Sequence, residues 1–373
     1  MKKVLLTSTA LFALSGAAAF AEITFSGEAE MGIAGGTGEV DVIPVDSAGV
    51  EGDEIKFDQT APAQFWNDVD VSFIMTGETD GGLAFGAEVE LFDPQDDLSG
   101  PFGEGDYSIF VSGDFGTVTM GDTDGALDFV LTDAGNIANP GSINDAETVH
   151  LGYEGSYLDG SGDGQIVRYD YSFDAFTFAA SVEQGDGPDF ITEDDNAITW
   201  AVGVGYEFDF GGGSVDTGLG YQYSDNATLT FDFEDAGFPS DLVIATGVEA
   251  SATGVGAVLN LDAGFSAGFT YTLYDFDGLD KNVHHTGLGV GYTFDAFSVH
   301  ANYGQYVTPR ADLQGWGISA GYDLGGGASI LAGYGRSDAD DFFVRDRVAD
   351  DGSGQLLNEL TIDTYSLGLS FSF

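Results

Sequence analysis

The sequence predicts an all-β protein, a sixteen-stranded antiparallel β-barrel that crosses a membrane. Three observations lead to this fold class. Apolar and polar residues alternate through many short segments, so each segment has one apolar and one polar face. The connections between these segments are alternately tight and long along the whole chain. No stretch beyond the amino terminus approaches the roughly twenty consecutive apolar residues that a membrane-spanning helix needs.

The amino-terminal segment has the pattern of a secretory signal peptide. It begins Met-Lys-Lys, continues with an apolar run over residues 4–14 and reaches Ala-Phe-Ala at residues 19–21, which fits an A-x-A cleavage site. We therefore expect a signal peptide over residues 1–21 and a single barrel over residues 22–373. The barrel is then expected to leave the cytoplasm.

The first expected strand covers residues 23–33. Ile23 and Met31 are among its apolar odd positions, whereas Glu28 and Glu30 occupy even positions. Because side chains alternate across a strand, one face of this segment meets an apolar medium and the other meets water.

The same period recurs in fifteen further segments. Tight turns join many of them, including Phe-Asp-Ala-Phe at residues 173–176 and 294–297. The period is weakest where Gly254 and Gly256 dilute it. An even number of strands with both ends on the tight-turn side allows the first strand to pair with the last and close the barrel. The fifteen segments cover residues 68–76, 83–91, 107–113, 117–121, 167–173, 176–182, 200–210, 215–223, 251–261, 265–273, 288–294, 297–303, 316–324, 330–334 and 365–373.

The polar face is heavily charged, which favours a water-filled lumen over the packed interior of a soluble sandwich. Its charged positions are Glu28, Glu30, Asp68, Asp70, Glu88, Glu90, Arg168, Asp170, Glu207, Asp209 and Asp216. Aromatic residues gather at strand ends beside tight turns, as in the interfacial girdle of a membrane barrel. They include Phe173, Phe176, Phe208, Phe210, Phe294, Phe297, Phe371 and Phe373.

Composition excludes several classes of function. The chain has 9 Lys and Arg against 63 Asp and Glu, a formal net charge of −54, and loss of the two lysines of the signal peptide leaves −56. Such a charge excludes nucleic acid as a partner, because basic side chains drive phosphate binding. It also suggests a saline habitat, where salt screens the repulsion between acidic groups. The absence of cysteine excludes disulfides, thiolate metal sites and thiol catalysis.

One long stretch, residues 122–164, interrupts the alternation and contains no Lys or Arg. It is the third of eight long connections, and a loop of this length in a compact β-protein is usually functional or disordered. Rings of acidic residues in a pore favour cations, whereas an acidic run is otherwise a solvated outer loop. Its charged residues are Asp122, Asp124, Asp128, Asp133, Asp145, Glu147, Glu154, Asp159 and Asp163.

Three segments resemble the general diffusion porins of rhodobacterial alphaproteobacteria: residues 73–87, residues 111–122 with Gly-Asp-Phe-Gly-Thr-Val-Thr-Met-Gly-Asp, and residues 321–330. The terminal Leu-Ser-Phe-Ser-Phe resembles the assembly signal of outer-membrane barrels. The resemblance implies a homotrimer in the outer membrane of a Gram-negative bacterium, with the third long loop folded into the lumen as a constriction. It also implies that loop acids face basic side chains on the opposite wall.

The expected site follows from the loop, the strand pattern and this resemblance. Of the basic residues, only Arg168 has a clear lumen-facing position, and it either contributes to a transverse field or pairs with a loop carboxylate. The expected constriction residues are Asp122, Asp124, Asp128, Asp133, Asp145 and Glu147, and the expected pore-wall residues are Arg168, Glu88, Glu90 and Asp170.

The expected function is passive diffusion of small hydrophilic solutes and ions, with a preference for cations and no required cofactor. The expected partners are these solutes, outer-membrane lipid or lipopolysaccharide, and two further copies of the chain. Calcium at acidic loops such as residues 275–280 and 338–341 is an open possibility, although neither matches an EF-hand. The alternatives are a barrel enzyme of the protease or lipase type and a calcium-dependent adhesin. The four histidines form no zinc motif, and G-x-S-x-G is absent.

Overall fold

We describe the protein from a computed structural model, which defines residues 22–45, 50–91, 107–155, 157–160, 165–184, 198–231, 242–309, 311–344 and 354–373. The expected signal peptide, Asp163 of the long loop, and three arginines lie outside the described residues. Those arginines are Arg310, Arg345 and Arg347.

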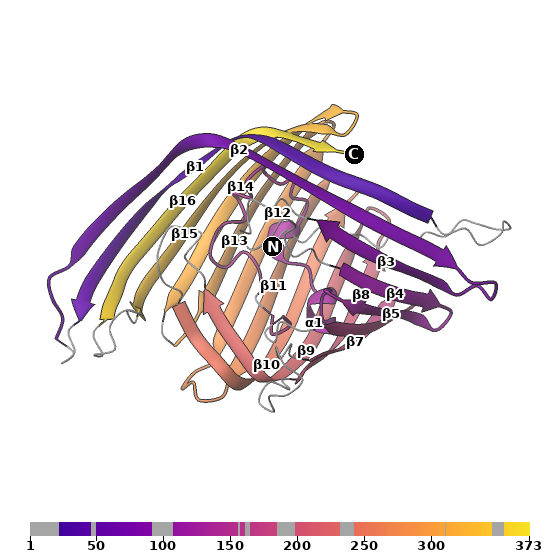
Figure 1. Cartoon of the computed structure of the whole chain (residues 1–373), viewed down its shortest axis with the longest axis horizontal. Helices are drawn as coiled ribbons and strands as arrows, with labels where there is room; N and C mark the ends of the chain where they lie inside the picture. The colour runs from indigo at the N-terminus through magenta and orange to yellow at the C-terminus, as the bar shows by residue number, and fades with distance from the viewer. Residues whose placement is uncertain are drawn as a thin grey trace.

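Sixteen antiparallel strands form a closed barrel in which β1 pairs with β16, as predicted (Figure 1). Every other strand pairs with its neighbours in the sequence. The strands are β1 (Glu22–Val45), β2 (Ile55–Glu78), β3 (Ala84–Leu91), β4 (Tyr107–Gly113), β5 (Gly116–Gly121), β6 (Ile166–Phe173), β7 (Phe176–Gln184), β8 (Ile198–Asp209), β9 (Gly213–Phe231), β10 (Leu242–Leu261), β11 (Phe265–Phe276), β12 (Val283–Phe294), β13 (Phe297–Val307), β14 (Asp312–Gly325), β15 (Ala328–Val344) and β16 (Gly354–Ser372).

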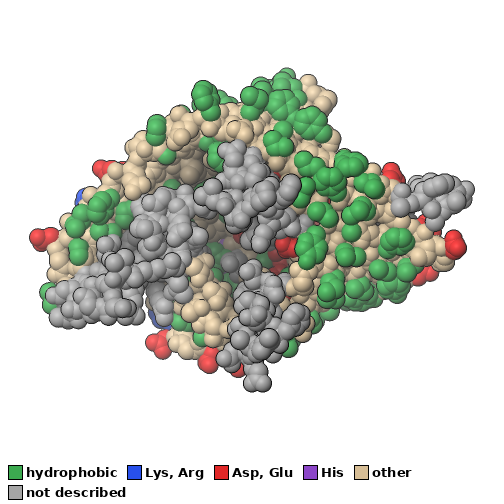
Figure 2. All heavy atoms as spheres, viewed as in Figure 1, with side chains coloured by type: hydrophobic (Ala, Val, Ile, Leu, Met, Phe, Trp, Pro, Cys, Tyr) green, Lys and Arg blue, Asp and Glu red, His purple; other side chains and the backbone are tan. Residues whose placement is uncertain are grey.

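Large apolar side chains lie exposed on the outer face of the strands, the reverse of a soluble protein (Figure 2). Phe173, Phe294 and Phe297 beside the tight turns are among the most exposed. A second band of aromatic side chains crosses the outer face further along the strands, where Trp316 and Tyr334 pack with ring centroids 5.4 Å apart. Two aromatic bands on one apolar surface are typical of a barrel that spans a lipid bilayer.

Several strands are longer than the alternation predicts. β2 begins at Ile55 rather than near residue 68, and its pairing with β1 slips between Ala34 and Gly36. Pro62 lies at this slip, where the absence of a proline N–H costs no ladder bond. β16 likewise begins at Gly354, far ahead of the expected strand. Irregular pairing hides such strand extensions from a strict two-residue period.

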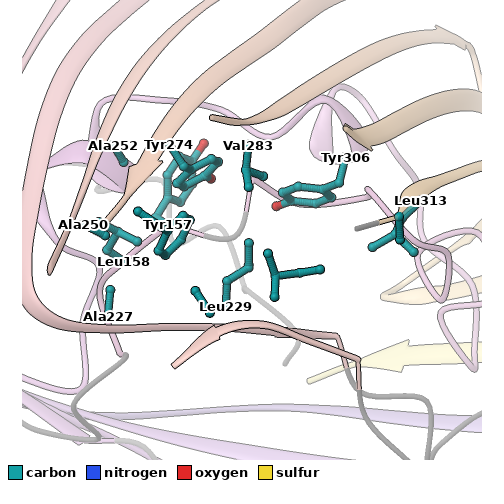
Figure 3. Packing of buried hydrophobic residues seen from close by; sticks show 14 of the residues in the cluster. Tyr157, Leu158, Ala227, Leu229, Ala250, Ala252, Tyr274, Val283, Tyr306 and Leu313 are labelled. Atoms are coloured by element: carbon teal, nitrogen blue, oxygen red, sulfur yellow. The ribbon is translucent and has the colours of Figure 1, made fainter. Parts of the chain in front are cut away.

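The described part of the stretch, residues 122–155 and 157–160, is here called the inner loop; it crosses the inside of the barrel and includes α1 (Ala126–Phe129) and η1 (Ala134–Asn136) (Figure 1). Buried side chains gather where the loop meets the wall, and Figure 3 shows Tyr157 and Leu158 of the loop beside Tyr274 of β11. Among the described residues, no helix is long and apolar enough to cross a membrane.

Candidate functional site: the lumen beside the inner loop

The inner loop runs along the wall in two legs, which we call the outbound leg (residues 122–143) and the return leg (residues 144–160). The outbound leg leaves β5 and meets the wall at β7, where the Ala126 amide donates to Ser181 Oγ at 2.8 Å. It reaches β1 and β16 at its tip, Ile143. Further bonds to this leg are donated by Thr270 Oγ1 of β11 to the Thr132 carbonyl (2.7 Å) and by Ser319 Oγ of β14 to Asn139 Oδ1 (2.5 Å).

The return leg runs along the same strands in the opposite direction, at positions further from the tight-turn end of the barrel. Thr364 Oγ1 of β16 donates to the Ala146 carbonyl at 2.9 Å, and Tyr306 of β13 donates to the Glu154 carbonyl at 2.7 Å. The two legs therefore cover an arc of wall from β7 round to β1. Because β5 leads into the loop and β6 bonds its root, β2–β4 form the part of the wall that faces the loop across the lumen. Other bonds of this leg join Leu151 N to Ser337 Oγ (2.9 Å), Leu158 N to Gln222 Oε1 (2.9 Å) and Gly160 N to Glu183 Oε2 (3.0 Å).

Glycines on the inner face of the wall let the loop backbone lie directly on the strands. A Cβ atom on Gly304 of β13 would overlap the backbone of Gly152, which itself has a φ of 85°. A Cβ on Gly317 of β14 would overlap the carbonyl of Glu147. Because a backbone carbonyl cannot rotate away as a side chain can, these positions accept only glycine while the loop stays in place. Glycines 203, 218, 289 and 335 have the same relation to the loop.

Three of the six loop acids expected at the constriction are buried. Asp133 Oδ1 accepts hydrogen bonds from the Gly155 amide (3.1 Å) and the Tyr157 hydroxyl (3.4 Å), and it thereby joins the two legs. Asp128 lies in α1 and is also buried. The third is Glu147. Burial limits these carboxylates to the packing of the loop rather than direct contact with a passing ion.

Glu147 is 1% exposed, and its Oε2 accepts a hydrogen bond from the Ser142 hydroxyl. Its Oε1 has no hydrogen-bond partner among the residues that the structure describes. Burial raises the pKa of Glu147 to about 7, because the charged form is desolvated. The return leg therefore carries a carboxyl group that is partly protonated at neutral pH.

The other three expected loop acids reach the lumen. Asp122 and Asp124 are exposed at the root of the outbound leg, and Asp145 is half-buried just beyond the tip. Two further loop acids, Glu154 and Asp159, are also only half-buried. These two carry charge in the predicted stretch, but they were not among the expected constriction residues because the sequence does not show which side of the loop they occupy.

Two of the expected wall acids lie on the arc that the loop leaves uncovered, and the third lies on β6 beside the root of the loop. Glu88 and Glu90 of β3 are half-buried, as is Asp170 of β6. On β1 and β2, register places Glu28 opposite Asp70, next to this group. Carboxylates therefore face the lumen from the wall as well as from the loop. Figure 2 shows acidic side chains within the hollow of the barrel.

Arg168 of β6 holds the root of the loop. Its Nη1 donates to Thr123 Oγ1 at 3.1 Å and to the Asp124 carbonyl at 2.7 Å, and its guanidinium lies 4.0 Å from the Phe129 ring centroid. Its Nε is 3.7 Å from Asp170 Oδ1. At 9% exposure, Arg168 presents little charge to the lumen, so the loop-pinning role matches its contacts better than the transverse field does.

We expect Arg168→Met to loosen the root of the outbound leg, because the long apolar side chain keeps the Phe129 contact but loses both donated bonds. Loss of two charge-assisted bonds corresponds to about 3 kcal/mol of local stability. Protease nicking near residues 122–130 should increase at least tenfold. Arg168→Lys keeps the charge and serves as the matched control. Equal nicking of the Met variant and wild type would refute the pinning role.

The remaining described basic side chains lie away from the loop. Lys56 pairs with Asp41 near the long-loop end of β1 and β2. Arg336 of β15 pairs with Asp363 of β16 at 3.5 Å, on the outer face beside Tyr334. Lys281 is exposed in the turn before β12.

The described residues contain no group of three or more His, Asp or Glu side chains placed to hold a metal ion. Calcium binding at the acidic loops stays a prediction.

Comparisons with known proteins agree with the barrel. Residues 7–341 match the profile of a family described as Gram-negative porin. A porin of Rhodobacter capsulatus is 32% identical over 284 residues, which cover 72% of this chain and 86% of that protein. A porin structure refined at 1.8 Å resolution has a TM-score of 0.60 and 25% identity, covering 94% of this chain and 100% of that one. A mutant of Rh. blastica porin, 18% identical with a TM-score of 0.53 and the same coverage, shares the fold.

Proposed function

Because this chain belongs to the Gram-negative porin family, we propose that it lets small hydrophilic solutes and ions diffuse passively through its lumen, with a preference for cations. Family membership itself identifies an outer-membrane channel. The preference for cations is supported by one observation above all. Exposed or half-buried carboxylates face the lumen from both the inner loop and the opposite wall, whereas Arg168 is buried.

The expected preference is moderate rather than absolute. A carboxylate about 8 Å from a cation contributes roughly 0.5 kcal/mol in water, so five such groups contribute about 2.5 kcal/mol before screening. At physiological ionic strength the Debye length is about 8 Å, which removes much of this energy. From these magnitudes we expect cations to permeate severalfold better than anions in dilute salt. The preference should weaken as the salt concentration approaches 1 M.

The proposal includes a homotrimer embedded in outer-membrane lipid, supported by the resemblance to trimeric porins and by the exposed apolar outer face. It also includes removal of the first 21 residues during export. Mass measurement of the detergent-solubilised protein tests both points, since a trimer of cleaved chains has slightly less than three times the mass of one full-length chain.

Reconstitution into planar bilayers tests pore formation. Stepwise conductance increases in KCl, together with swelling of vesicles in solutions of small neutral sugars, are expected. Vesicles that remain impermeable to both ions and sugars would contradict the channel and would revive the alternatives of a barrel enzyme or an adhesin.

A further inference from the structure

A chain of hydrogen bonds ties both legs of the inner loop to one strand. His300 Nδ1 of β13 is 2.8 Å from the Ile137 carbonyl on the outbound leg, and its Nε2 is 3.0 Å from Asn302 Nδ2. Asn302 Oδ1 is 2.5 Å from His150 Nε2 on the return leg. The chain thus joins the two legs through two side chains of β13, near the middle of the covered wall.

The partners determine where the protons lie. The Ile137 carbonyl only accepts, so His300 Nδ1 carries a hydrogen and the Nε2 of the neutral ring accepts from the Asn302 amide group. Asn302 Oδ1 then accepts, so His150 Nε2 carries a hydrogen. His150 Nδ1 lies 3.1 Å from the Leu151 carbonyl and has room for one extra proton there. A second proton, on His300 Nε2, would place that N–H group against the N–H group of Asn302, and neither can accept a hydrogen bond.

Burial makes that second proton costly. His150, His300 and Asn302 are all buried, so water cannot replace a broken bond. Among the residues that the structure describes, the other titratable groups beside this chain of bonds are Glu147 and Tyr153 from the loop and His285 from β12, whose Nε2 lies 3.0 Å from the Gly152 carbonyl. The wall strands β14 and β15 face it with uncharged positions, glycine 315 and serine 337.

We propose that His150, Asn302 and His300 form an acid-sensitive latch: protonation of both imidazoles breaks the chain, frees the middle of the inner loop from β13 and narrows the channel. The latch rests on the proposed channel function, because its effect is a change in conductance.

Glu147 contributes to stability with the opposite pH dependence, so its effect can be distinguished from that of the latch. Its raised pKa means that its favourable contribution is present at acid pH and is lost as the pH rises through about 7. Burial lowers the pKa of His150, so the stability that its neutral form contributes is present above pH 6.5 and is lost as the pH falls. Loosening as the pH falls below 6.5 therefore has the sign expected of the latch and the opposite sign to that of Glu147.

Single-channel conductance from pH 7 to 4.5 tests the latch. The matched variant is His150→Gln with His300→Asn, in which non-titrating amide groups take the places of His150 Nε2 and His300 Nδ1, one bonded nitrogen on each side of the chain. The bond between residue 300 and Asn302 is absent from this variant at every pH. All lumen carboxylates remain, so their protonation affects both proteins equally. Wild type is expected to lose at least half of its conductance or to flicker into a lower state, whereas the double variant should lose markedly less.

Identical pH profiles in the two proteins would overturn the latch while leaving the channel intact, whereas absence of channels at pH 7 in wild type would overturn the channel itself. If the double variant does not insert, His150→Gln alone keeps the donor towards Asn302 and removes one of the two protons. It should shift the conductance loss to lower pH, and an unshifted midpoint would also refute the proposal.

Discussion

Gly304→Ala is expected to detach the return leg of the inner loop and to change both the size and the noise of single-channel currents. A methyl group at Gly304 overlaps the backbone of Gly152, so either the loop or β13 must move. Overpacking of this kind costs about 3 kcal/mol, and that energy corresponds to a change of roughly 150-fold in the equilibrium between seated and detached loop. The loop yields first, because β13 is held by ladders on both sides.

The matched control is Gly205→Ala on β8, a glycine whose added methyl group meets its nearest neighbours at 3.7 Å or more. It should leave current amplitude, noise and protease sensitivity of the loop unchanged. The thermal unfolding of both barrels should stay close to that of wild type. A quiet, wild-type current from Gly304→Ala would show that the loop does not depend on this close approach.

Two triple variants that each replace three loop acids by amides should affect ion selectivity unequally. The first carries Asp122→Asn, Asp124→Asn and Glu154→Gln, which neutralise side chains that reach the lumen. Removing three of the five contributions of roughly 0.5 kcal/mol each predicts that most of the severalfold preference for potassium over chloride is lost in dilute salt, with a smaller change where salt screens it.

The second triple variant carries Asp128→Asn, Asp133→Asn and Glu147→Gln, which neutralise buried loop acids. Its permeability ratio should change by no more than about twofold, because these groups contribute through loop packing and their fields are partly offset by desolvation. The reverse order, with the buried set changing selectivity more, would contradict the assignment of which acids face the ions.

The fold was predictable because a barrel wall depends on a local pattern. Alternation placed the strands, and the number of tight and long connections placed the inner loop between β5 and β6. The direction of each loop acid was not predictable. Asp133 and Asp124 lie in the same acidic stretch, yet Asp133 is buried because Gly155 and Tyr157 of the other leg bond to it. Such partners depend on the path of the folded loop.

The inward glycines on which the loop backbone rests are visible in the sequence as a Gly-x-Gly pattern, but the alternation of the strands obscured it. Gly254 and Gly256 appeared only to weaken the alternation of one strand, yet both face the loop residue Leu131. Gly-x-Gly recurs at inward positions of neighbouring strands, and this recurrence indicates a wall on which another backbone rests. The pairs are glycines 218 and 220, 254 and 256, 287 and 289, 315 and 317, and 333 and 335.

Arg168 shows that the residue type and the strand face it occupies do not determine the role of a side chain. Both a transverse field and loop pinning were compatible with its expected lumen-facing position. The deciding contacts come from Thr123, Asp124 and Phe129, about 40 residues earlier in the chain.

The most direct test of the cation preference is the zero-current potential of the wild-type channel between dilute and concentrated KCl. We predict that the dilute side becomes positive, because potassium crosses faster than chloride, and that this potential shrinks as both solutions approach 1 M. A dilute side that becomes negative would show anion preference and would contradict the role assigned to the lumen carboxylates.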